Sequence, residues 1–378
     1  MAGRSSPPPA RSDVAQGGTT GTLTLHFQPH ARLAPVDVPL PHDISAVAVV
    51  GRTLFAACDE TATVERLVRA ADGDYHQEES IALCDHFDLP EGRSGEMDIE
   101  GLAIDGDFLW ITGSHSLKRD KPDLAWDDNA KALDELEDID RDPNRYFLGR
   151  LPLAVDRGGV HRPARSGARS GNDGPACLKI GRKGRNALTK VLHRDRHLAP
   201  SVSMPCKENG FDIEGLAVEG ERVFLGVRGP VLSGWAVVVE LRMKAAKPGR
   251  LKLCRCGAKG RRYLKHFLPL RGLGIRDLRF DGDDLLVLAG PTMDHDGTGA
   301  LFRWRSPVGA GDDRVHRPQD IHHIMDLPYA RGVDQAEGVA FVQVGDRRRL
   351  LVVHDSPAPA RLGAAGESLV VDLLDLAR

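Results

Sequence analysis

Three glutamates occupy the same position in closely similar stretches of the sequence. Glu100 lies in "DIEGLAIDG", Glu214 in "DIEGLAVEG" and Glu337 in "QAEGVAF", while Arg276 takes the corresponding position in "GIRDLRFDG". Hard divalent cations such as Ca²⁺ prefer carboxylate oxygens as ligands. Carboxylates that gather without a cation repel one another, unless positive side chains lie among them. The pattern therefore leaves two alternatives open, a divalent-cation site and an internal network of salt bridges.

The stretches that carry this position are predicted to be β-hairpins. Each consists of an apolar run, a Gly-centred turn and a second apolar run, and Gly accepts the positive φ that a tight hairpin turn requires. The turns read VGR, DGD, EGE, DGD and VGD. The five stretches span residues 43–60, 98–115, 212–229, 274–291 and 335–356.

Further strand-like segments follow each hairpin, so we expect an all-β fold, a β-propeller with four-stranded blades. A β-sandwich would not explain why the hairpin recurs. Five blades are the favoured number, and a sixth within residues 98–211 is the alternative. The last unit supplies only three strands, so the N-terminal segment Leu23–Phe27 is predicted to pair with "SLVVDLLDL" and close the ring. Residues 19–378 would form this single domain, preceded by a disordered Pro/Ser/Gly-rich segment over residues 1–18.

Small residues in the first strand of several hairpins have a packing explanation. Gly101, Gly215 and Gly338 follow the glutamates directly. Side chains alternate between the two faces of a strand, so these glycines mark a face with little bulk. We expect that face to let the next blade approach closely, which explains the glycines but not the glutamates.

The two strands of a hairpin are antiparallel, so the start of the first and the end of the second lie on one face of the disc. The candidate site residues gather there by this argument. We assign catalytic roles to His115, Arg228 and Arg276, ligand binding to Asp59, Asp277, Asp294 and Asp355, and metal binding to Glu100, Glu214 and Glu337.

Two long insertions interrupt the pattern. Residues 117–145 contain a short amphipathic helix near Ala130–Leu136 and leave the second hairpin on the face of the glutamates, so they form either a lid or a solvated surface helix. The second insertion spans residues 154–200 and is basic. Residues 156–175 are rich in Gly, Ser and Arg, which predicts a flexible segment, and a short helix is expected in residues 181–198. A solvated loop is favoured there over an RNA-binding segment, because no aromatic residues interleave with the basic ones.

Composition excludes several classes of protein. The formal net charge is −3, which argues against a nucleic-acid partner. The longest apolar runs, such as "ISAVAVV", are too short to cross a membrane, and the first residues lack the apolar stretch of a signal peptide. The six cysteines have no framework spacing. These features indicate a cytoplasmic monomer with reduced cysteines.

The chain resembles a bacterial family of propellers of unknown function. The resemblance rests on "DIEGLAIDGDFLWITGSHSLKR", "KENGFDIEGLAVEGERVFLGVRGPVLSGWAVVVEL", "GLGIRDLRFDGDDLLVLAGPTMD" and "AEGVAF". More distantly, the "EGLA" strand is similar to one in phytase-like and lactonase-like propellers, and that likeness implies acidic groups that hold calcium at the mouth of the channel. Fold alone does not determine function.

Two functions therefore remain open. In one, the protein is a metal-dependent hydrolase of a small anionic ester or lactone, with Ca²⁺ or another divalent cation as its cofactor. In the other, it is a non-catalytic propeller that binds a protein partner and whose Glu/Arg ring is structural. No nucleophile motif such as Gly-x-Ser-x-Gly is present, but a metal-activated water would not require one.

Overall fold

The computed structural model describes most of the chain after its first nineteen residues. The described residues are 20–29, 32–33, 38–119, 121–122, 128–165, 174–257, 260–293, 295–307, 311–364 and 366–376. The predicted disorder of residues 1–18 concerns a segment outside these ranges.

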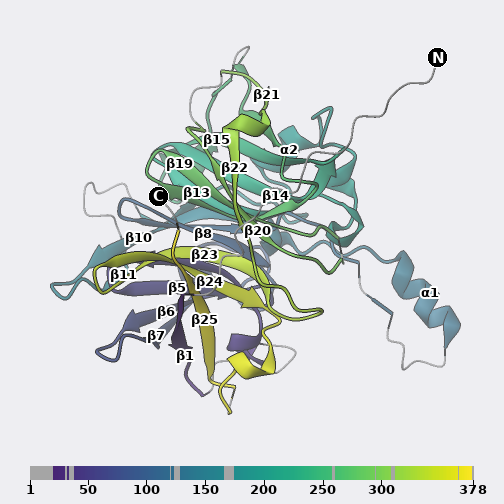
Figure 1. The fold of residues 1–378 in the computed structure, drawn as a ribbon. Coiled ribbons are helices and arrows are strands. Elements are labelled where there is room, and N and C mark those ends of the chain that lie inside the picture. Colours follow the sequence, from purple (N-terminus) through teal and green to yellow (C-terminus); the bar gives the residue numbers. More distant parts are fainter. Residues whose placement is uncertain are drawn as a thin grey trace, which may run out of the picture.

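The fold is all-β, as the sequence predicts, and strands dominate it (Figure 1). Each hairpin is followed along its sheet by two further strands, and we call each set of four a unit. The first unit holds β4 (Ile44–Val50), β5 (Thr53–Cys58), β6 (Thr63–Arg69) and β7 (Tyr75–Ala82). The second holds β8 (Ile99–Asp105), β9 (Phe108–Gly113), β10 (Leu148–Val155) and β12 (Ala176–Cys177).

The remaining units follow the same order. The third holds β13 (Asp212–Glu219), β14 (Arg222–Leu232), β15 (Trp235–Lys247) and β17 (Tyr263–Leu268). The fourth holds β18 (Gly274–Asp281), β19 (Asp284–Gly290), β20 (Ala300–Trp304) and β22 (Ile321–Asp326). The last holds β23 (Gln335–Val344), β24 (Arg347–Asp355), β25 (Ser368–Leu374) and β1 (Gly21–His26). Short strands outside the units are β2 (Arg32–Leu33), β3 (Val38–Pro39), β11 (His161–Pro163), β16 (Arg250–Leu253) and β21 (Arg314–Val315).

The first strands of the units form a closed cycle. β4 contacts β8, β8 contacts β13, β13 contacts β18, β18 contacts β23, and β23 contacts β4 again. Hydrophobic clusters fill the gaps between neighbouring units, so each unit depends on the next one for its core. This arrangement brings the five starts of the first strands to one end of the cycle and the five hairpin turns to the other.

The glycines of the first strands permit this close approach. A Cβ added at Gly101 would lie 2.6 Å from the Cβ of Leu216 in the next unit, and one added at Gly215 would lie 3.0 Å from Leu278. The first distance is shorter than real Cβ contacts, and at the second Leu278 would have to move by a few tenths of an ångström. The packing explanation of these glycines is therefore confirmed.

The N-terminal strand completes the last unit, as predicted. β1 pairs antiparallel with β25 from Gly21↔Leu373 to His26↔Ser368. Its other edge pairs in parallel with β7 of the first unit at Leu25↔Tyr75 and His26↔His76. β1 thus joins the last unit to the first.

The two insertions differ from each other in the structure. The first contains α1 (Asn129–Glu137), which projects from the body of the protein and has no buried residue (Figure 1). Its base is fixed by a β-bridge between Lys118 and Asp140. Beyond that bridge, Asn144 is fully buried, so the expected insert 117–145 extends too far at its C-terminal end.

The second insertion contains the short helix that the sequence predicts within residues 181–198. α2 (Ala187–Leu192) begins with a capping box on Asn186, and Leu188, Leu192 and Leu198 belong to the largest hydrophobic cluster. The central part, residues 166–173, lies outside the described residues. Short 3₁₀ segments complete the fold, at Leu40–His42, Leu83–Asp85, Pro143–Tyr146, Ser201–Ser203, Cys206–Glu208, Pro318–Asp320 and Pro359–Arg361.

Candidate functional site

A β-bulge marks the glutamate position in every hairpin. In each hairpin the register between the first and second strands shifts across this position, and in the third it also shifts between Asp212 and Ile213. A bulge residue has no partner of its own, and its side chain is re-aimed relative to the regular strand. We call these bulge residues the ring positions; they are Ser45, Glu100, Glu214, Arg276 and Glu337.

A polar cavity lies at the ring end of the cycle. It has a volume of about 520 Å³, and Glu100, Glu214, Arg276 and Glu337 all contribute to its wall. A neighbouring cavity of about 310 Å³ shares four of its lining residues, so the two are parts of one depression. The shared residues are Asp59, Glu100, Lys207 and Arg228. We call the combined depression the ring cavity.

Arginines neutralise one half of the ring. Arg276 Nη1 lies 3.2 Å from Glu214 Oε2 and also pairs with Glu337. Arg228 lies 2.9 Å from Glu214 and 2.9 Å from Asp212. The glutamates of the third and last units are thus held in one buried network, in which each carboxylate has an arginine partner.

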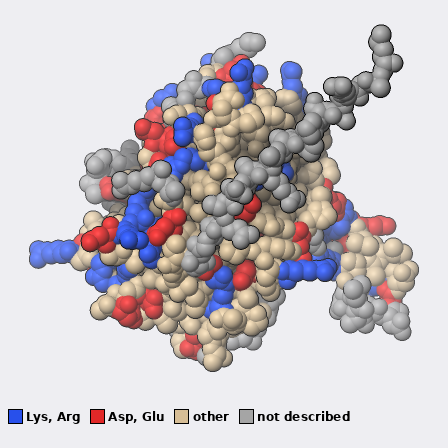
Figure 2. Space-filling model, in the orientation of Figure 1, with Lys and Arg blue, Asp and Glu red and all other residues tan. Residues whose placement is uncertain are grey.

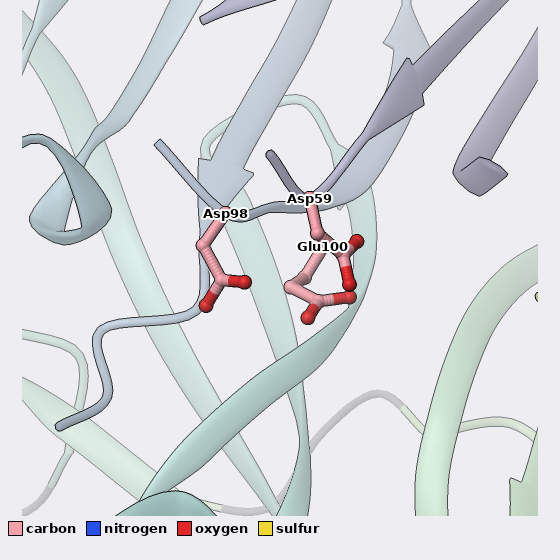
Figure 3. A group of neighbouring side chains, drawn as sticks. All are labelled: Asp59, Asp98 and Glu100. Carbon is pink, nitrogen blue, oxygen red and sulfur yellow. The ribbon is translucent and has the colours of Figure 1, made fainter. Parts of the chain in front are cut away.

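In the other half of the ring, three carboxylates lie close to one another. Oxygens of Asp59, Asp98 and Glu100 lie within 4.8 Å of one another, and their side chains face one another in Figure 3. Asp98 pairs with Arg145, which also lies 2.6 Å from Glu96. Among the ion pairs of the described residues, none involves Asp59 or Glu100. We call this group the carboxylate triad.

The environment of the triad disfavours negative charge. Burial raises the pKa of Asp59 well above its usual value, and Asp43 and Asp98 raise it further. Burial likewise raises the pKa of Glu100, and Asp59 and Glu214 add to the effect. Asp59 Oδ1 is a buried oxygen without a hydrogen-bond partner. A bound cation would stabilise the ionised carboxylates and supply the missing partner.

Comparison with known proteins identifies the family. Residues 43–372 match the family described as "Protein of unknown function (DUF3616)". The chain belongs to the DUF3616 family. No curated protein sequence matches it.

Solved structures similar to this DUF3616 protein share little sequence with it. The Myxococcus xanthus glutaminyl cyclase is 10% identical, with 94% of this chain and 98% of that chain covered and a TM-score of 0.36. The Bombyx mori GH32 β-fructofuranosidase is 10% identical, with 93% and 64% covered and a TM-score of 0.40. The Pseudomonas aeruginosa periplasmic gluconolactonase is 14% identical, with 84% and 65% covered and a TM-score of 0.32. This chain thus spans less than two thirds of the last two, and scores this low carry no argument about activity.

Only some of the predicted ligand-binding residues of the DUF3616 chain lie at the ring cavity. Asp59 and Asp355 line the ring cavity, as expected. Asp277 does not: it is buried in the interior, where it lies 2.9 Å from Arg279 and accepts a hydrogen bond from the Val339 amide. Asp294 lies outside the described residues.

The assignment of His115 to the ring cavity is wrong. The ring is buried, and Asn186 Nδ2 lies 3.0 Å from Nε2, while Nδ1 lies 3.0 Å from the Gly113 carbonyl. Since an amide N–H can only donate, Nε2 accepts and Nδ1 carries the proton. Burial lowers the pKa of His115 to about 4, so the neutral ring serves as an internal cross-link rather than as an acid or base at the mouth.

Several polar residues of the site were not predicted. Asp98 and Asp212 open the two "DIEG" stretches, and Asp43 opens the corresponding "DISA" stretch. This shared first position was visible in the sequence and could have identified them. Lys207 and Arg145 had no comparable signal in the sequence. Arg145 follows the second hairpin and Lys207 precedes the third, and neither position recurs next to the other hairpins.

Proposed function

We propose that the ring cavity binds a divalent cation at Asp59, Asp98 and Glu100 and uses it in the hydrolysis of a small anionic ester or lactone. We also infer that the closed cycle of first strands is a propeller of five blades. The observation that carries the functional proposal is the carboxylate triad, in which two of the three members form no ion pair among the described residues.

The residues of the triad suit a hard cation. All three offer carboxylate oxygens, which Ca²⁺, Mg²⁺ and Mn²⁺ prefer, and no thiolate or imidazole belongs to the group. The third charge is balanced by Arg145, which pairs with Asp98. The bound metal would polarise an ester oxygen and lower the pKa of a coordinated water.

Positive side chains near the triad could bind the anionic part of a substrate. Lys207 lines both parts of the ring cavity, is exposed, and forms no ion pair within the part of the chain that the structure describes. Arg228 lines both parts as well, but its guanidinium is held by Asp212 and Glu214. We therefore assign substrate binding to Lys207, and orientation of the cavity wall to Arg228.

A non-catalytic binding role is the second candidate. The network of Arg228, Arg276, Glu214 and Glu337 favours it, since these groups satisfy one another without any ligand. Under this alternative the ring rigidifies the centre, and the cavity binds a small molecule without turning it over.

Two matched variants test the cation site. In Glu100→Gln, the stabilisation of the protein by Ca²⁺, Mg²⁺ or Mn²⁺ should disappear, because a triad ligand is lost. In Glu214→Gln, the protein should lose stability but keep its cation response, because this glutamate serves the arginine network. Melting temperature with each cation and with chelator measures both. A cation at about 100 times its Kd stabilises the folded state by about 2.7 kcal/mol, which is readily detected.

Either of two outcomes would contradict the site. The wild-type protein could show no cation response, or Glu100→Gln could respond as fully as Glu214→Gln does. If the cation binds, hydrolysis of a panel of lactones and phosphate and carboxylate esters separates the catalytic function from the binding one. Cation-dependent turnover that falls at least tenfold in Lys207→Ala supports the hydrolase, whereas cation binding without turnover supports the second candidate.

A further inference from the structure

A strongly basic surface lies at the end of the second insertion. The chain contains no Asp or Glu from Lys179 to Arg194. The cationic side chains of this segment are exposed, and none of them forms an ion pair or a hydrogen bond within the described residues. The next acidic residue, Asp195, is buried and pairs with Lys265. We call this group the basic surface; it consists of Lys179, Arg182, Lys183, Arg185, Lys190, Arg194 and Arg196.

The helix α1 carries the opposite charge. Residues 128–138 contain five Asp and Glu side chains and one cation, Lys131. The last four acidic residues form no ion pair in the part of the chain that the structure describes; they are Asp134, Glu135, Glu137 and Asp138. Surfaces of opposite charge attract each other and steer association. Each of these two surfaces therefore has in the other a partner of the right sign.

The same helix exposes apolar side chains. Leu133 and Leu136 are 54% and 47% exposed, and Ile139, just after the helix, is 44% exposed. The leucines are three residues apart, so they share a face of α1. Ala132 and Glu135 are half-buried, which places the leucine face away from the body of the protein. Contact with another surface would remove these leucines from water.

The base of the α1 insert lies beside the basic surface. Burial lowers the pKa of His193, and the charges of Arg141 and Arg185 lower it further, so one cation from each insertion lies near this ring. Arg141 directly follows Asp140, which belongs to the bridge that closes the α1 insert. α1 itself projects from the body (Figure 1), and it leaves the cations of its own chain exposed. An arm next to an uncovered surface suits the exchange of arms between two copies across a two-fold axis.

We propose that the protein forms a two-fold dimer in which α1 of each copy docks on the basic surface of the other. Leu133 and Leu136 would be buried in the contact, and Asp134 and Glu137 beside them would pair with the exposed cations. The dimer contains this contact twice, so both surfaces of both copies are covered. Neither surface contains a residue of the carboxylate triad, so the proposal is independent of the cation site.

A nucleic acid suits these surfaces less well than a second copy of the chain. It would neutralise the cations, but residues 174–207 contain no Phe, Tyr or Trp on which bases could stack. It would also leave the leucine face and the acidic side chains of α1 without a partner. A second copy satisfies both surfaces.

Sedimentation velocity of the nuclease-treated full chain, over a range of micromolar concentrations, tests the proposal. We expect a dimer at about 0.1 M salt, and at least a tenfold rise in its dissociation constant at about 1 M, since the Debye length falls from about 10 Å to about 3 Å. A monomer at every concentration would overturn the proposal, as would a dimer that does not respond to salt.

Charge reversal on either surface provides the sharper test. Asp134→Lys combined with Glu137→Lys should weaken the dimer at least tenfold, and so should Lys190→Glu combined with Arg194→Glu, because both contacts then bring like charges together. An equal mixture of the two variants should form a heterodimer, because opposite charges face each other again in both contacts. A mixture that stays monomeric would count against the dimer and overturn the proposal.

A matched control carries the same change in charge as the basic-surface variant. Arg331→Glu combined with Arg347→Glu replaces two exposed cations outside both surfaces and should leave the dimer unchanged. Leu133→Ala combined with Leu136→Ala should weaken the dimer at least tenfold without altering the melting temperature in high salt, since α1 has no buried residue. Loss of the dimer in the control, or a monomer that binds single-stranded RNA through the basic surface, would overturn the proposal.

Discussion

At the scale of single residues, one bulge position supports two electrostatic solutions. Glu214 and Glu337 are paired with Arg276, whereas Glu100 faces Asp59 and Asp98. A register shift occurs at this position in each case, and the nearby side chains differ. The second unit has no arginine at the end of its second strand, where the third has Arg228.

The arginine network predicts a large effect of Arg276→Gln. The variant leaves Glu337 without an arginine partner and Glu214 with Arg228 alone. Breaking a buried ion pair from one side typically costs about 3–5 kcal/mol. Urea unfolding near neutral pH should show a loss of this size. Adding Glu337→Gln should restore part of the stability, because the unpaired charge is removed.

A loss below about 1 kcal/mol in Arg276→Gln would contradict the network, as would a double variant less stable than the single one. Arg331→Gln is a suitable control, because this arginine is almost fully exposed and its contact with Asp296 is 4.0 Å long. Exposed pairs of this kind contribute about 0–1 kcal/mol.

The sequence predicted part of the site at this scale. The meeting of Glu214, Glu337, Arg228 and Arg276 followed from equivalent positions in similar hairpins. The error at His115 had a local cause, because the residue adopts a positive φ of 58° just after β9, and no pattern in the sequence predicted this turn toward Asn186.

At the scale of elements, β1 is a strand of one unit that also contacts another. It pairs along six residues with β25 and at two residues with β7. Without it, both of these strands would present unpaired edges. The strand therefore contributes to two sheets at once.

Deletion of residues through Pro29 should lower the melting temperature clearly and promote aggregation. Both effects follow from the loss of the β1–β25 ladder and of the buried side chains Leu23, Leu25 and Phe27. Deletion of residues 1–18 alone should leave the melting temperature unchanged and serves as the control. Equal melting temperatures for the two deletions would show that β1 does not stabilise the fold.

The insert that carries α1 should be separable from the fold. Replacing residues 121–138 with a short Gly/Ser linker keeps the bridge between Lys118 and Asp140 and the buried Asn144. Since α1 has no buried residue, the melting temperature should stay the same. Circular dichroism and thermal melting measure the outcome, and a variant lacking residues 118–144 should fail to fold, because it loses Asn144 and its three hydrogen bonds.

Elements were predicted better than insertions. The strands after each hairpin have continuous apolar or alternating runs, and these runs became β6, β7, β15, β17, β20, β22 and β25. The short helix expected in residues 181–198 is α2, but its burial was not predicted. The spacing of Leu188 and Leu192 by four residues is a helical signal that could have identified this buried face.

At the scale of the whole molecule, both signs of charge are mixed over the face drawn in Figure 2, in keeping with the net charge of −3. Among the described residues, no helix has both the length and the apolar character needed to cross a bilayer. Several buried ionisable groups have shifted pKa values, so they gain or lose protons outside their usual pH range. We therefore expect the free energy of unfolding to depend on pH through the titration of these buried groups.

Two sets of buried groups act in opposite directions on the pH dependence. Burial raises the pKa of Asp43 and Asp212 to about 7, so the folded protein keeps protons that the unfolded chain releases above about pH 4. Their contribution to stability is therefore lost as the pH rises from about 4 to about 7. Burial lowers the pKa of His115, His316 and His354 to about 4, so their contribution rises between pH 4 and 6.5.

Above about pH 6.5 these histidines are neutral in both the folded and the unfolded state. We therefore expect stability in the presence of chelator to fall between pH 6.5 and pH 8, as the buried carboxyl groups lose their protons. At pH 8 a saturating divalent cation should restore part of the loss, because it takes the place of the protons that Asp59 and Glu100, whose pKa values burial also raises, hold at lower pH. Melting temperature against pH, with chelator and with cation, measures both. Stability that keeps rising up to pH 8 in chelator would contradict the raised pKa values.

The closure of the ring by β1 also has a consequence for biosynthesis. The Thr20 hydroxyl donates to the carbonyl of Leu373, 353 residues further along the chain. The ribosome makes β1 long before β25 exists, and its other contact, with β7, spans two residue pairs. A nascent chain must therefore carry an unmatched strand through most of its synthesis. During that time, chaperones or a neighbouring nascent copy can capture this strand, so the yield of folded protein depends on how quickly translation reaches β25.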